Sequence, residues 1–260
     1  MNRMTLLSLL AASLLAACGG DDTRYRDRVI EVPGEPVENP VEYMPVDGFV
    51  LGFWVMDQDD ACDSFCLNDY SAYGSPLFAA DLNHAPLAQA PVLGDEGAIG
   101  GVLPFTGDWQ ASTQESAVFS NTLIGERFAI HLRARTSEET LRTVLSLGTA
   151  SGTAMNIQLA RQSLVAEFPR QAKRLLVSLD DAADWQEIQL AADGERVTLQ
   201  VGCTEVASFD RVSGAPILST APTRAMLGAR WGSSATDAFT GEVDVLRISR
   251  QTETNLFCAE

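Results

Sequence analysis

The segment "DWQEIQLAADGERVTLQVGCTEVAS", Asp184 to Ser208, shows most clearly how this chain folds. Apolar and polar residues alternate on both sides of its centre, the apolar ones being Leu190, Val197, Leu199 and Val201. A period of two is typical of a strand with one buried face. Asp193 and Gly194 lie between the two runs, and both residue types tolerate the positive φ that tight hairpin turns require. The segment therefore predicts two antiparallel strands joined by a short turn.

The same alternation continues outside this segment. In "RFAIHLRART" one strand face carries Phe128, Ile130, Leu132 and Ala134. The other face carries His131, Arg133 and Arg135, and we expect His131 to be solvated there. Beyond the first 17 residues, no segment shows helical spacing except the turn-sized piece 136–142. Many strands joined by Gly-rich turns predict an all-β sandwich or barrel, and residues 46–260 are enough for one such domain.

Residues 1–17 have the composition of a secretory signal peptide. One charge, Arg3, precedes an apolar run that is too short to cross a bilayer as a helix. The run ends in "LAAC", which resembles the bacterial lipobox and implies that the mature chain begins at a lipid-carrying Cys18. The alternative is an ordinary signal peptide followed by a chance cysteine. Gly19 follows Cys18 in place of the aspartate of inner-membrane retention, which favours the outer membrane or cell surface.

The composition of residues 18–45 and the charge of the chain indicate which classes of partner to exclude. This stretch is rich in proline and charge and has no periodicity, so it predicts an extended, disordered tether. The formal net charge of the whole chain is −17. Such a surface repels nucleic acid and anionic lipid headgroups. We therefore expect no nucleic-acid partner, and no membrane contact except through the lipid on Cys18.

An ordered series of motifs in the rest of the chain resembles laminin-G-like domains. The segments that carry the resemblance are "DGFVLGFWVMDQ", "NDYSAYGSPL", "GAIGGVLPFTGDW", the hairpin segment quoted first, "MLGARWGSS" and "FTGEVDVLRISR". Each motif alone is weak, but their order and spacing match the family from Asp47 to Arg250. The resemblance implies a two-sheet antiparallel jelly-roll sandwich of the concanavalin A-like lectin and glucanase superfamily, occupying residues 46–260.

The last of these segments also resembles the catalytic strand of family 16 glycoside hydrolases. Glu242 and Asp244 spell most of that family's E-x-D-x-x-E, but Arg247 stands where the acid/base would be. Arginine cannot donate a proton at neutral pH. The hydrolases also carry their motif mid-chain, whereas here it lies in the final strand. The two histidines, His84 and His131, form no local zinc motif, and no nucleophile elbow, P-loop or dinucleotide fingerprint appears. For these reasons together we predict a protein that is not an enzyme.

The cysteines fit an exported protein. If Cys18 carries lipid, four others remain, which allow three pairings. In the fold that the resemblance implies, the first and last strands run antiparallel, so the residues that follow them lie at opposite ends. That topology favours the pairs Cys62–Cys66 and Cys203–Cys258. The alternative is that these thiols stay reduced, which an oxidising compartment disfavours.

Candidate binding residues come from residue type and position. Sugar sites use an aromatic face beside a few polar groups. Trp109 and Trp231 lie at strand ends and are candidates for such stacking, with partly buried packing as the alternative, whereas Trp54 and Trp185 are expected in the core. Many relatives hold a structural calcium, and Asp69 and Asp244 could supply its oxygen ligands.

The functional expectation is a lipid-anchored, non-catalytic binding module. By fold analogy its ligand is a glycan or surface polymer. The alternative is a structural or interaction module that binds another envelope protein. A glycoside hydrolase of the family 16 type is a distant third.

Overall fold

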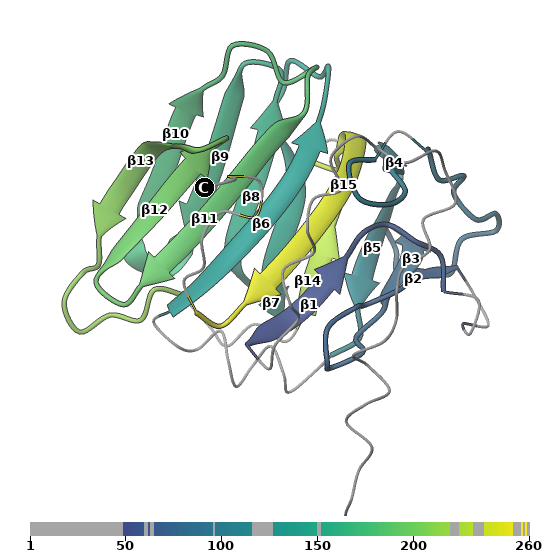
Figure 1. Ribbon diagram of the computed structural model, residues 1–260, viewed down its shortest axis with the longest axis horizontal. Helices are drawn as coiled ribbons and strands as arrows, with labels where there is room; N and C mark the ends of the chain where they lie inside the picture. Colours follow the sequence, from purple (N-terminus) through teal and green to yellow (C-terminus); the bar gives the residue numbers. More distant parts are fainter. Residues whose placement is uncertain are drawn as a thin grey trace, which may run out of the picture. The chain divides into compact units, whose positions relative to one another are not determined.

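Two antiparallel β-sheets make up nearly all the regular structure in the described part of the chain (Figure 1). The computed structural model describes residues 49–59, 62, 65–95, 97–115, 127–149, 152–218, 224–230, 237–251, 256 and 258. The expected signal peptide, the tether with Cys18, and the candidate Trp231 lie outside the described residues.

The first sheet, here called sheet A, has the strand order β1-β15-β6-β11-β12-β13, and β4 also pairs with β15. Its strands are β1 (Val50–Trp54), β4 (Leu103–Thr106), β6 (Arg127–Arg135), β11 (Gln186–Asp193), β12 (Arg196–Val201), β13 (Thr204–Asp210) and β15 (Thr240–Ser249). The first described strand thus lies beside the last, and β6 is paired on both edges.

The second sheet, sheet B, has the order β10-β9-β8-β7-β14-β5-β3-β2. Its strands are β2 (Cys66–Leu67), β3 (Leu77–Asp81), β5 (Trp109–Thr113), β7 (Arg142–Thr149), β8 (Gly152–Ala160), β9 (Ser163–Phe168), β10 (Lys173–Ser178) and β14 (Arg224–Leu227). A 3-10 turn, η2 (Pro169–Gln171), joins β9 to β10. No helix among the described residues is long and apolar enough to span a membrane.

The core lies between the two sheets and follows the alternation in the sequence. On β6 the buried inward side chains are Phe128, Ile130, Leu132 and Ala134, as the pattern predicted. Sheet B supplies the opposing layer, including Val144, Leu147, Ile157, Leu159 and Leu164. The predicted all-β class and two-sheet antiparallel jelly-roll sandwich are therefore confirmed.

The hairpin β11–β12 forms where it was predicted, but its turn begins after Asp193, which was expected to be a turn residue. Asp193 is the last residue of β11, and its side chain accepts hydrogen bonds from the amides of Glu195 (2.9 Å) and Arg196 (2.8 Å). Gly194 adopts a φ of 105°, a value that favours glycine. Asp193 thus caps the turn through its carboxylate and does not take a positive φ itself.

The outer face of sheet A is covered near β1 and β15, which the sequence pattern did not predict. A second apolar cluster forms there from Val50, Phe53, Val55, Ile99, Val245 and Leu256. Two segments outside the sheet therefore pack onto this face, one around Ile99 and the other around Leu256 near the C-terminus. His131 is fully buried beneath the second segment, and its Nδ1 accepts a hydrogen bond from the amide of Leu256 (3.1 Å). The expectation that His131 is solvated was wrong.

Both expected disulfides are present. Cys62 and Cys66 are joined with their Cα atoms 6.2 Å apart, and Cys203 and Cys258 with theirs 5.6 Å apart. The second bond ties the C-terminal segment to the turn between β12 and β13. It thereby holds in place the chain that buries His131.

Candidate functional site

Six side chains on the outer face of sheet A form the best-defined polar group in the described part of the chain. They come from three adjacent strands and the residue before β11, and we call them the Trp185 cluster: Arg133, Arg135, Trp185, Glu187, Glu242 and Asp244. The sequence analysis did not name four of them as candidate site residues: Arg133, Arg135, Trp185 and Glu187. It expected Trp185 to lie in the core.

Strand register brings these residues together. On β6 the alternation puts Arg133 and Arg135 on the face opposite the core. Arg135 lies directly across from Glu242 on β15, and Arg133 lies directly across from Glu187 on β11. Side chains directly opposite each other in antiparallel strands are close enough to interact. Trp185 shares the face of Glu187, two residues away.

Each arginine of the cluster pairs with carboxylates. The Nε atom of Arg135 donates to Oε2 of Glu242, with side-chain exposures of 31% and 33%. Arg133 donates from Nη1 to Oδ2 of Asp244, and its Nε lies 3.9 Å from Oε1 of Glu187. These contacts hold both guanidinium groups in fixed positions over the sheet.

The indole ring of Trp185 lies against both guanidinium groups. The Cζ atoms of Arg133 and Arg135 are 4.4 and 4.6 Å from the ring centroid, within the range of a cation–π contact. The tryptophan is half-buried. The expectation that Trp185 belongs to the core was wrong, because its ring lies against two guanidinium groups on the outer face of sheet A.

Asp244 anchors the cluster from below. Its side chain is fully buried, and Oδ2 also accepts a hydrogen bond from the amide of Ala98 (2.9 Å). Oδ1 has no hydrogen-bond partner, and the backbone at Gly97 lies so close that an added Cβ would be 2.8 Å from it. Burial raises the pKa of the Asp244 carboxyl, against the opposing effects of the Ala98 amide and Arg133. Burial also raises the pKa of Glu187, against the attraction of Arg133 and with help from Asp244.

The predicted calcium ligands are held by protein contacts that leave little for a cation. Asp69 accepts hydrogen bonds from the amides of Phe53 (2.9 Å), Ser71 (2.8 Å) and Ser75 (2.6 Å), and from the Ser71 hydroxyl (2.8 Å). It therefore serves as the cap of its own turn and as the link from that turn to β1. Asp244 is paired with a guanidinium group, which would repel a calcium ion. Neither residue fits the calcium role that the sequence analysis gave it.

Trp109 packs inside the protein, which was the alternative to a role in stacking on a sugar. Its ring is 5% exposed and stacks on Phe105 with centroids 4.5 Å apart, within the main core. It is therefore not available to stack on a sugar, and its candidacy as a ligand contact was wrong. Trp54 is fully buried as expected, and its Nε1 donates to the carbonyl of Ser75 (3.1 Å).

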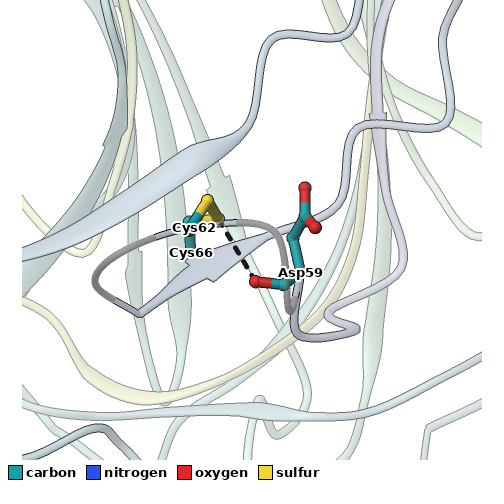
Figure 2. Close-up of side chains that lie close together, drawn as sticks. All are labelled: Asp59, Cys62 and Cys66. Atoms are coloured by element: carbon teal, nitrogen blue, oxygen red, sulfur yellow. Dashed lines mark hydrogen bonds between the residues drawn. A yellow bond between two sulfur atoms is a disulfide. The ribbon is translucent and has the colours of Figure 1, made fainter.

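One group of metal-ligand types lies close together among the described residues, and it consists of Asp59, Cys62 and Cys66. Both sulfur atoms are used in the disulfide, so they cannot bind a metal as thiolates. Figure 2 shows the backbone carbonyl of Asp59 facing the disulfide, with its oxygen 3.8 Å from Cys66 Sγ, and a carboxylate oxygen of Asp59 lies within 4.8 Å of both sulfurs. This group is a structural feature of the loop.

The residues that resemble the family 16 motif make contacts of their own in the sheet. Glu242 is bound to Arg135, and Arg247 is almost fully buried, with its Cζ 5.7 Å from the ring centroid of Phe53. The sequence did contain a signal for the Trp185 cluster, namely Arg133 and Arg135 on one strand face. It could not show that Glu187 and Trp185 would lie beside them, because that depends on the register between distant strands.

Comparisons with known proteins give the fold but no family. No protein-family model matches the chain, and no curated protein matches it. Among solved structures, domain 4 of AbnA, a GH43 extracellular arabinanase from Geobacillus stearothermophilus, is similar with a TM-score of 0.57 and 15% identity. That match covers 80% of this chain and 98% of the domain, whose structure was solved in complex with arabinotriose.

The binding domain of botulinum neurotoxin DC is also similar, with a TM-score of 0.59 and 10% identity. Here 81% of this chain matches 50% of the toxin chain, so this chain spans half the length of that relative. The structure of the toxin domain is of a complex with SialylT. Another structure of the same domain is a complex with rat synaptotagmin II. At these identities the likeness shows that this chain shares a β-sandwich with carbohydrate-binding domains.

Proposed function

We propose that this chain is a non-catalytic glycan-binding module of laminin-G-like fold, displayed at the cell surface by a lipid on Cys18. The observation that carries the binding activity is the match to the arabinanase domain. It covers 98% of a domain whose structure was solved in complex with arabinotriose, so the likeness extends over nearly the whole of that domain. Fold alone does not confer function, so the site must supply the rest of the argument.

The Trp185 cluster supports this function. A partly exposed aromatic ring beside several fixed polar groups is the usual composition of a sugar site. The proposal excludes catalysis because Glu242, the residue in the nucleophile position, is bound to Arg135, and because Arg247 cannot act as an acid. Turnover of β-glucan that disappears in Glu242→Gln would contradict this part of the proposal.

Surface display rests on the N-terminal sequence. The apolar run ending in "LAAC" is the feature that favours lipidation, and the proline-rich residues 18–45 would hold the module away from the membrane. Domains on such tethers can reach ligands beyond the membrane surface.

The test is a glycan-array screen of the purified full chain, with calcium and again with chelator. We expect saturable binding to one class of glycan, unchanged by the chelator because Asp69 and Asp244 are bound by protein groups. A folded protein that binds no glycan would contradict the proposal and favour the alternative of an envelope-protein partner.

A further inference from the structure

We infer that the Trp185 cluster is the ligand-binding site and that its ligand is a neutral oligosaccharide. This inference rests on the proposed function and deepens it, because it names the site and the class of glycan. The evidence consists of the accessibility of the cluster, its rigidity and its charge.

Accessibility separates Trp185 from the other two tryptophans in the described part of the chain. Trp54 and Trp109 are buried between the sheets. Trp185 is partly exposed, and so are the two residues that pair beside it, Arg135 and Glu242. A ligand that reaches the ring would therefore also meet a guanidinium group and a carboxylate.

Rigidity comes from the sheet. The six residues of the cluster lie on or next to the central strands β15, β6 and β11, and cross-strand ion pairs fix the directions of both arginines. Asp244 adds a buried support that connects Arg133 to the amide of Ala98. A site whose side chains are already ordered loses little conformational entropy when a ligand binds.

The charges select the ligand class. Two guanidinium groups face the carboxylates of Glu187, Glu242 and Asp244, so the cluster has no excess of positive charge. The chain around it carries a formal charge of −17. An acidic sugar or a polyanion would therefore be repelled. Sugar hydroxyls, in contrast, both donate and accept, so vicinal hydroxyls can accept from an arginine N–H while donating to a carboxylate.

The experiment is a calorimetric titration of the full chain with a panel of neutral oligosaccharides, starting with arabinotriose, and with one sialylated trisaccharide. We expect a neutral sugar to bind, Trp185→Ala to weaken its binding about tenfold or more, and Glu242→Gln to weaken it less. The sialylated sugar should bind more weakly than the neutral one.

Two variants serve as matched controls. Phe49→Ala removes another exposed aromatic ring that has an arginine, Arg250, 4.9 Å from its centroid. Glu167→Gln alters the ion pair with Arg174 (3.5 Å), in which the partners also lie directly opposite each other, but on sheet B. Both controls should keep the affinity of the unaltered chain. If Trp185→Ala does not fold, Trp185→Phe and Arg135→Lys test the same site with smaller changes.

The possible failures are distinguishable. Unchanged affinity in a folded Trp185→Ala would overturn the site but leave glycan binding in place. Tighter, salt-sensitive binding of the sialylated sugar would overturn the neutral class. Binding of no sugar from either class would contradict the proposed function and this inference with it.

Discussion

The aspartates of this protein show how local contacts decide what a carboxylate does. Asp69 was a calcium candidate by residue type, but four hydrogen bonds make it the cap of a turn. Asp244 was a candidate for the same reason, yet it supports Arg133 from beneath the Trp185 cluster. The residue types pointed to sites of polar interaction. They could not show that backbone amides and an arginine would take the place of a metal.

Replacing Asp69 should destabilise the fold without affecting any metal dependence. Asp69→Ala leaves the amides of Phe53, Ser71 and Ser75 without their acceptor, and we expect a loss of about 2–4 kcal/mol in the free energy of unfolding. Urea denaturation measures this loss. Asp81→Ala, which uncaps the exposed amides of Asn83 and Ala85, is the matched control and should cost about 1 kcal/mol. A melting temperature of the unaltered chain that falls on chelation would restore the calcium hypothesis.

Asp193 and Asp244 should titrate on opposite sides of the ordinary aspartate value. The amides of Glu195 and Arg196 lower the pKa of Asp193, so its stabilising contribution is present above the unfolded-state pKa of about 3.9 and is lost as pH falls through the folded value. Burial raises the pKa of Asp244, so its contribution is present below about pH 3.9 and is lost as pH rises through the folded value. Carboxyl-carbon NMR titration measures both, and an Asp193 that titrates above Asp244 would contradict the assignment.

At the scale of elements, the alternation of apolar and polar residues predicted local structure but not which distant strands pair. The alternation gave β6 and the β11–β12 hairpin with their buried faces, because each depends on residues close in sequence. It could not show that β6 lies between β15 and β11, or that a C-terminal segment packs onto the outer face. His131 was misplaced for that reason, since its burial comes from chain 125 residues away.

The two disulfides should differ in their contribution to stability. Cys203–Cys258 closes a loop with a sequence separation of 55, and Cys62–Cys66 one with a separation of 4. In the loop-entropy model these closures stabilise by about 4 and about 2 kcal/mol. Cys258→Ser should therefore lower the unfolding midpoint in urea more than Cys62→Ser does.

The same pair of variants tests the C-terminal segment. Because Leu256 and His131 are held together near the longer bond, hydrogen exchange at the Leu256 amide should accelerate in Cys258→Ser and stay slow in Cys62→Ser. Equal exchange in both variants would mean that the apolar contacts of Leu256 hold the segment without the disulfide.

At the scale of the whole molecule, the sequence gives two separate instructions. Residues 46–260 were predicted to form the sandwich, whereas for residues 1–45 export and attachment stay predictions from composition and a lipobox-like motif. The fold was predictable because an ordered series of weak motifs constrains topology better than any one of them. The Trp185 cluster was not, because its residues come together only through strand register.

Attachment by Cys18 has a direct test. Cys18→Ser should move the protein from the membrane fraction to the soluble fraction and abolish incorporation of a labelled fatty acid. The sandwich should be unaffected, so the soluble variant should keep the melting temperature of the unaltered chain. Retention of Cys18→Ser in the membrane fraction would show that something other than this cysteine holds the protein there.

The pairing of β1 with β15 has a consequence for the order of folding. The strand Val50–Trp54 has its sheet partner in Thr240–Ser249, and β6 also needs that strand on one edge. Contacts between such distant parts of a chain form late and slowly. A chain still being synthesised can therefore form the β11–β12 hairpin but not the centre of sheet A. Folding should be completed only after β15 has been synthesised. Until then β1 has no sheet partner and must be protected from aggregation.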